Sequence, residues 1–373
     1  MTLPLRRSTL ALALLAALPA ALAQTHTGHD AATDLDHVIV TASPLAATAE
    51  DLVRPVEVLS GERLDRAKSA TLGETVSRLP GVQSSYFGPG VGRPVVRGFE
   101  GPRVQVVSDG LGAGDVSTVS VDHAVSVEPF LADQIEVLKG PSTLLYGTGA
   151  IGGAVNVVEG RVPEAATAEP LQGRAELRGD TVNDERTGML RLDGTSASGR
   201  LVFHVDALHR ETGDYRIPGH AESAAGHEAH EDEFGDEAGA YARLPNSALR
   251  TDSASLGLSW VGDRGFIGAS RSLFNTRYGI PMGAHAHEDA HDGHDDHADD
   301  EHAHGEAPVR IVLDQRRTEV RGGLDELPGL TSARLKLART DYTHTEFEGD
   351  AVGTVFDNDS LDARLELVHR PFA

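Results

Sequence analysis

From about Gln172 onward the sequence alternates apolar and polar residues with a period of two, and this alternation constrains the fold most strongly. In the segment SASLGLSWV, the apolar residues Leu256, Leu258 and Trp260 share one face, opposite serines and a glycine. The segments LDARLELV, ARLKLAR, GRLVFHVDA and GMLRLDG behave likewise. The pattern predicts about eight strands, in either a soluble antiparallel sandwich or a membrane barrel.

The lengths of the connections between these strands favour the barrel. Short connections are expected around Ala197, Gly262 and Pro328, and a connection of medium length is expected around Gly349. Two long connections, 211–250 and 278–308, alternate with them. Short turns at one end and long loops at the other are typical of outer-membrane barrels, so both long loops are expected on the extracellular side.

The N-terminus has the pattern of an export signal. Arg6 and Arg7 precede an apolar run from Leu10 to Leu18, and an Ala-Leu-Ala cleavage pattern ends at Ala23. The run is too short for a membrane-spanning helix, and no stretch of about 20 apolar residues follows anywhere. The sequence has no cysteine, which excludes disulfides and thiolate metal sites. A membrane role would therefore depend on strands.

Histidine and carboxylate residues concentrate in the two long connections. The segment 282–308 holds nine carboxylates, no Lys or Arg, and seven histidines: His285, His287, His291, His294, His297, His302 and His304. The stretch 220–237 adds seven carboxylates and His220, His227 and His230. Imidazole suits Zn²⁺, Cu²⁺ and Ni²⁺, so these loops are expected to capture a divalent metal, although a merely solvated acidic tract has the same composition.

The net charge of −24 is largely confined to these two segments. An acidic balance of this kind argues against nucleic-acid binding, which needs clusters of Lys and Arg, and favours collecting cations. The stretch from Arg54 to Glu159 has instead the mixed strand and helix signals of a compact α+β domain. No nucleophile–base constellation, HExxH motif or phosphate-binding loop is present, so the chain is not expected to be an enzyme.

Three segments resemble the TonB-dependent outer-membrane receptors. They are DHVIVTASP at 36–44, the run from TLGETVSRLPGV to RVQVVSDG, and IEVLKGPSTLLYGTGAIGGAVNVV. The resemblance implies a signal peptide at 1–23, an N-terminal extension at 24–50, an α+β plug domain at 51–165, and antiparallel transmembrane strands of a partial β-barrel at 170–373. It also implies TonB, with its inner-membrane energising complex, as a partner that pairs with the TonB box through Asp36, His37, Val38, Ile39, Val40, Thr41 and Ala42.

Four further features are similar to the zinc-uptake branch of that family. They are SVDHAVSVEP, RLPNS, the His-rich third loop and DYTHTEFEGDAVGTVFDND. The resemblance implies that Asp122 and His123 on the plug hold the ion, with a barrel partner at His344 or Glu346. The expected function is uptake of Zn²⁺ as a transported ion, without a resident cofactor. Receptors for a siderophore, haem or copper, and a secreted metal-binding protein, remain alternatives.

The chain departs from the family in its number of strands. Family members close a barrel of about 22 strands, whereas about eight are expected here, and an eight-stranded barrel has room only for side chains. An unclosed sheet would also leave an unpaired edge in lipid. The chain is therefore expected to be a fragment or a truncated product that does not transport alone.

Overall fold

The computed structural model describes residues 39–40, 47–48, 56–140, 146–147, 149–221, 241–281 and 307–370. The expected signal peptide and the seven histidines of the segment 282–308 lie outside the described residues. So does the TonB box except β1 (Ile39–Val40), which pairs with β2 (Ala47–Thr48). No helix in the described part of the chain is long and apolar enough to cross a membrane.

The first domain is an α+β plug, as the sequence predicted. Its five-stranded sheet has the order β3-β8-β9-β6-β7, with β6 and β9 parallel and the other pairs antiparallel. The strands are β3 (Val56–Ser60), β6 (Val104–Ser108), β7 (Leu111–Gly112), β8 (Gln134–Lys139) and β9 (Gly153–Val158). A separate pair is formed by β4 (Val82–Ser84) and β5 (Pro94–Val96), and short 3-10 turns lie at η1 (Gly101–Arg103) and η2 (Pro129–Leu131).

The helical stretch that follows β3 is divided into α2 (Gly61–Ala67) and α3 (Leu72–Val76). The break has a local cause, because the Thr71 hydroxyl accepts from the Glu74 backbone N–H and so starts a new helix. Leu64 and Val76 pack with Ile135 and Val155 in the plug core, which makes the plug a compact frame for its loops.

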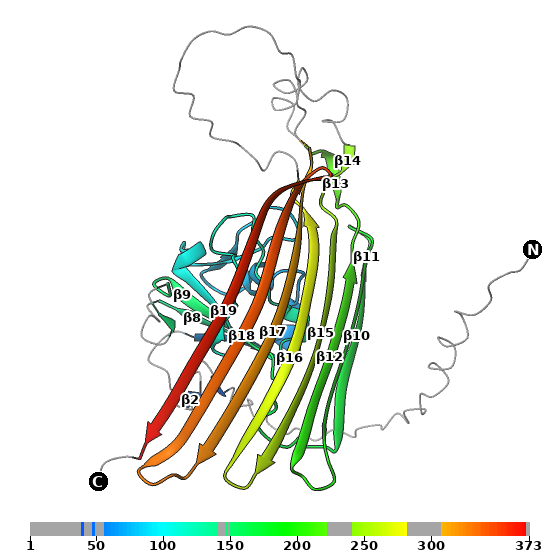
Figure 1. The fold of residues 1–373 in the computed structure, drawn as a ribbon. Coiled ribbons are helices and arrows are strands. Elements are labelled where there is room, and N and C mark those ends of the chain that lie inside the picture. Colours follow the sequence, from blue (N-terminus) through cyan, green and yellow to red (C-terminus); the bar gives the residue numbers. More distant parts are fainter. Residues whose placement is uncertain are drawn as a thin grey trace, which may run out of the picture. The chain divides into compact units, whose positions relative to one another are not determined.

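The second domain is one antiparallel sheet of eight strands in chain order, which confirms the predicted barrel-type fold (Figure 1). Its strands are β10 (Leu171–Asp180), β11 (Glu185–Thr195), β12 (Leu201–Glu211), β15 (Leu249–Gly262), β16 (Gly265–Gly279), β17 (Val309–Asp325), β18 (Leu330–Glu348) and β19 (Ala351–His369). Leu256, Leu258 and Trp260 are exposed on the outer face, whereas the alternate side chains are buried against the plug. The alternation in the sequence therefore gives the sheet one face of exposed apolar side chains, which suits lipid, and an opposite face that contacts the plug.

The connections have the predicted order of lengths with one exception. The long connections after β12 and after β16 leave the same end of the sheet, and a small hairpin of β13 (Arg216–His220) and β14 (Tyr241–Arg243) lies in the first of them. The medium loop expected around Gly349 is wrong. The strands β18 and β19 run on to Glu348 and Ala351, so that only Gly349, at φ 61°, and Asp350 join them.

The plug contacts the inner face of this sheet through polar side chains. Gln315 on β17 donates to the Ala113 carbonyl at 3.0 Å, and Arg210 on β12 pairs with Glu128 at 3.0 Å. At Gly257 the plug chain passes so close that a Cβ would lie 1.7 Å from the Arg161 carbonyl oxygen. Only glycine fits there, which fixes how closely plug and wall approach.

Candidate metal centre between plug and barrel

The plug contributes His123 from an irregular loop between β7 and η2. The loop is held by Asp115, whose carboxylate accepts from the backbone N–H groups of Ser117 at 3.1 Å and Ser126 at 2.9 Å. Arg93 adds a second anchor by donating to the carbonyls of Ser117 and Ser120. Because the loop is anchored at these points, the fully buried His123 side chain has a fixed position.

The barrel contributes His344 and Glu346 from β18. The two residues are separated by one position, so their side chains lie on the same, inward face of the strand. The Nε2 of His123 lies 3.0 Å from Glu346 Oε1, and the Nε2 of His344 lies 3.4 Å from the same oxygen. The three potential ligand atoms all lie within 4.8 Å of one another. The structure therefore brings together three of the four residues predicted for this site.

Hydrogen bonds on the far side of each ring direct both Nε2 atoms toward Glu346. The Val116 carbonyl lies 3.0 Å from Nδ1 of His123 and must accept a proton from it. The Tyr342 hydroxyl lies 3.2 Å from Nδ1 of His344, whose buried Nε2 has no hydrogen-bond partner. Such contacts orient the ring and define the tautomer in metal sites.

The electrostatics of the cluster favour a bound cation. Nδ1 of His123 lies beside the Val116 carbonyl and Nε2 lies 3.0 Å from the Glu346 carboxylate, so both ring nitrogens face acceptors. Two acceptors at that distance repel each other unless a proton or a metal ion lies between them. The His123 and His344 rings, with centroids 4.1 Å apart, are therefore arranged around a point that requires positive charge.

The fourth predicted residue, Asp122, is not part of this group. Its carboxylate accepts from the Ser120 hydroxyl, and its backbone carbonyl accepts from the Tyr278 hydroxyl at 3.2 Å. The same tyrosine oxygen accepts from the Ala124 N–H at 3.0 Å. The backbone of Asp122 thus helps to fix the loop next to His123, whereas its carboxylate contacts Ser120 and not the cluster.

The loop histidines cannot be placed in the same way. His220 ends β13 and is exposed, whereas His227, His230 and the histidines of 282–304 lie outside the described residues. Of the residues predicted to contact TonB, Ile39 and Val40 alone are described. Metal capture by the loops and TonB contact by the box therefore stay predictions.

Two features of the inner face were missed by the sequence reasoning. Tyr342 is two residues before His344, so the period-two rule places it on the same face, and this signal could have been read. His204 has its two ring nitrogens 2.7 Å from Asp193 and 2.8 Å from Asp206, both on the barrel wall. Because both nitrogens are engaged by carboxylates, His204 holds the wall together and offers no free ligand atom.

Comparison with known proteins relates the first domain of the chain to a known family. Residues 48–154 match the TonB-dependent Receptor Plug Domain family. The vitamin B12 transporter BtuB of Photobacterium profundum is 30% identical over 139 residues, which is 37% of this chain and 23% of that protein.

Solved structures of larger receptors resemble the fold of the chain. The copper transporter OprC aligns with a TM-score of 0.59 at 15% identity, over 90% of this chain and 45% of its own. The ferric yersiniabactin uptake receptor FyuA from Yersinia pestis aligns with a TM-score of 0.56 at 17% identity, over 87% of this chain and 47% of its own. The chain thus spans less than half the length of these receptors.

The chain carries a TonB-dependent receptor plug followed by strands of the barrel wall, and it is an outer-membrane protein. Receptors of this class are transporters, which agrees with the expectation that the chain is not an enzyme.

Proposed function

We propose that the chain is the metal-receiving part of a TonB-dependent receptor for uptake of a divalent metal ion, with Zn²⁺ as the transported substrate. One observation carries the proposal: His123 of the plug and His344 and Glu346 of the barrel wall present three ligand atoms to one point. A ligand set that spans two domains lets the ion itself connect them. The bound ion would therefore be sensed by the plug as well as held by the wall.

The donor atoms support zinc in particular. Two imidazoles and one carboxylate form the ligand set of several three-residue zinc sites, in which water or substrate takes the fourth position. The sequence has no cysteine, and the buried Met189 packs with Phe130, Leu131 and Leu208 away from the cluster. No described residue therefore offers the cluster a sulfur ligand, which a site for Cu⁺ would need.

Cu²⁺ is the second candidate, because the fold resembles a copper transporter and imidazole binds Cu²⁺ well. A siderophore or haem receptor is less well supported, since three ligand atoms within 4.8 Å of one another suit a bare ion. Competition between Zn²⁺ and Cu²⁺ for uptake separates the first two candidates.

The mechanism follows from the loop that carries His123. The His-rich loops would collect the ion outside the cell and release it to the cluster, where it would connect His123 of the plug with Glu346 of the wall. Arg93 lies just before β5 in the sequence and holds the same loop through Ser117 and Ser120. A displacement of His123 would therefore be transmitted to the strands of the plug. The plug would then offer segment 36–44 to TonB for strand pairing.

Zinc titration calorimetry of the full-length protein tests the proposal. His123→Ala is expected to weaken binding at the buried site by more than about a hundredfold, since loss of a ligand exceeds the 10- to 100-fold effect of outer contacts. His209→Ala is the matched control, because His209 is a histidine on the exposed outer face that pairs with Asp252. Equal zinc affinity of the His123→Ala variant and the wild type would contradict the proposal.

A further inference from the structure

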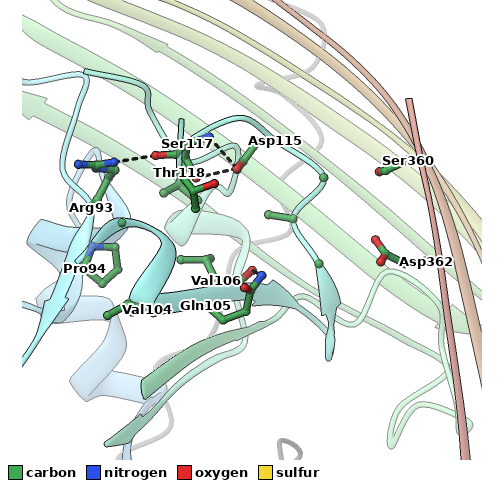
Figure 2. A pocket seen from close by; sticks show the side chains of 15 residues that line it. Arg93, Pro94, Val104, Gln105, Val106, Asp115, Ser117, Thr118, Ser360 and Asp362 are labelled. Atoms are coloured by element: carbon green, nitrogen blue, oxygen red, sulfur yellow. Dashed lines mark hydrogen bonds between the residues drawn. The ribbon is translucent and has the colours of Figure 1, made fainter. Parts of the chain in front are cut away.

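Next to the metal cluster lies a cavity of about 270 Å³ between the plug loop and β19 (Figure 2). Asp115, Ser117 and Thr118 of the loop line one side, and Ser360 and Asp362 project from β19 on the other. A water molecule occupies about 30 Å³, so the cavity has room for a cation with a shell of about six waters.

The cavity adjoins the cluster through a single residue of the loop. Val116, whose carbonyl contacts His123, lies in the sequence between Asp115 and Ser117, two residues that line the cavity. On the barrel side the even-numbered residues of β19 face inward, beginning with Phe356, whose ring centroid lies 5.0 Å from that of His123. Asn358, Ser360 and Asp362 continue this row, at about 7 Å per step along one face of a strand.

The row leads from the cluster toward the periplasm. β19 begins at the end of the sheet from which the long loops leave, and such loops are extracellular in outer-membrane barrels. Asp362 lies six residues after Phe356, which is about 20 Å along an extended strand. A second hollow of about 610 Å³ shares Gln105, Gly112 and Asp362 with the first and extends to Leu367. Asp362 thus stands where the two spaces meet.

Asp362 differs from the other carboxylates around it. Asp115 accepts from the Ser117 and Ser126 backbones and hydroxyls, and Glu366 is paired with Arg364. Within the described residues no hydrogen bond or ion pair engages the Asp362 carboxylate, whose oxygen lies 3.3 Å from where a Cβ on Gly112 would be. The Ser360 hydroxyl is likewise buried without a partner. The Arg93 guanidinium also lines the cavity, but its Nη1 is bound to the Ser117 and Ser120 carbonyls.

We infer that Asp362, with the Ser360 hydroxyl, is a transit site for a hydrated divalent cation that has left His123, His344 and Glu346 on its way to the periplasm. The inference rests on the proposed function. An unpaired carboxylate attracts a divalent ion through its water shell without binding it tightly. A weak site is what a transit step requires, because the ion must leave again.

The test compares uptake of radioactive Zn²⁺ by cells with zinc binding by the purified full-length protein. Asp362→Asn is expected to lower the uptake rate at saturating zinc about tenfold, since it removes the negative charge that attracts the divalent ion. Its zinc affinity at the buried cluster should stay within about twofold of wild type. Asp359→Asn, which removes the same charge from the exposed outer face of β19, should change neither quantity.

Two further variants separate charge from shape. Asp362→Glu keeps the charge and should retain uptake. Ser360→Phe fills the cavity and should slow uptake while zinc affinity is retained. This second variant keeps the test valid if Asp362→Asn fails to reach the membrane. Wild-type uptake by Asp362→Asn, or a loss of affinity as large as that of His123→Ala, would overturn the transit site alone. A wild-type protein that neither binds nor takes up Zn²⁺ would overturn the proposed function as well.

Discussion

Two of the places where the plug meets the barrel wall have opposite chemistry. At the cluster of His123, His344 and Glu346, three potential ligand atoms face one another, and His344 Nε2 has no hydrogen-bond partner. Nearer the periplasmic ends of the strands, Asp109 of the plug meets Arg321 of β17 at 2.8 Å, and Glu319 lies between Arg321 and Arg317. There every charge has an opposite charge beside it.

The histidine cluster can therefore bind a ligand, whereas the ion pairs around Arg321 hold the plug in place. Burial opposes ionisation of Asp109, but Arg321 outweighs this effect and keeps the pKa of Asp109 below its usual value. The ion pair is therefore complete without any ligand. The histidine cluster instead leaves a ring nitrogen without a hydrogen bond, which a bound metal ion would engage. The two sites together would therefore allow the plug to stay in place and still respond to the ion.

The largest expected effect is at the complete site. Arg321→Met leaves Asp109 and Glu319 buried without their shared partner, and losing one member of a buried pair costs about 3–5 kcal/mol. Limited proteolysis should show the plug of this variant cleaved much faster than that of the wild type. Arg316→Met, on the exposed outer face of β17, serves as the control, and equal cleavage of the two variants would contradict the holding role.

The next effect is at the incomplete site. Glu346→Gln keeps the shape of the side chain and removes the charge that attracts the cation. Zinc affinity should fall about 30-fold or more, because the amide oxygen of Gln remains as a weaker, uncharged ligand and the loss is smaller than for His123→Ala, while protease resistance of the plug stays unchanged. A plug that loosens as in Arg321→Met would show that the cluster holds the plug without metal.

A third prediction concerns acid pH at the edge of the ion-pair region. Burial raises the pKa of Glu159 to about 6 from 4.5, Asp109 adds to this shift, and Arg161 opposes it. Since the folded state holds the proton more tightly, ionised Glu159 costs stability above pH 6, and this cost vanishes below pH 4.5.

Glu159→Gln imitates the protonated form and removes this dependence. Its stability relative to wild type should therefore fall by about 2 kcal/mol between about pH 7.5 and about pH 4.5, as measured by urea unfolding of the plug. The exposed Glu169→Gln should show no such trend. A relative stability of Glu159→Gln that rises on acidification would contradict the direction of the shift.

The smallest effect should come from Tyr342. Its hydroxyl contacts Nδ1 of His344 and orients the ring, so Tyr342→Phe should weaken zinc binding about tenfold without changing the number of ions bound. Tyr86→Phe is the control, because Tyr86 is more than half exposed. Unchanged affinity in Tyr342→Phe would mean that packing against Phe356 suffices to hold His344 in place.

Much of the fold could be predicted because the relevant signals are local. The period-two pattern around Trp260 and Leu365 gives strands, their number and their exposed faces. The same rule puts His344 and Glu346 on one face. The turn at Gly349 was predicted to be longer, because the sequence does not show that the ends of β18 and β19 remain paired up to Glu348 and Ala351.

The pairing between domains could not be predicted from the residues themselves. Asp109 and Arg321 are separated by 212 positions, and His123 and Glu346 by 223, so no pattern in the chain connects them. A family resemblance pointed to Asp122 and His123 together. The structure distinguishes them, because the Asp122 carboxylate is occupied by the Ser120 hydroxyl whereas the His123 imidazole faces the barrel.

The most direct test of the central claim is an anomalous difference map at the zinc edge from crystals of the full-length protein grown with Zn²⁺. A strong peak should lie within coordination distance of Nε2 of His123, Nε2 of His344 and the Glu346 carboxylate, at about 2.0–2.2 Å from each. Zinc peaks elsewhere in the protein, with none between these three residues, would contradict the account.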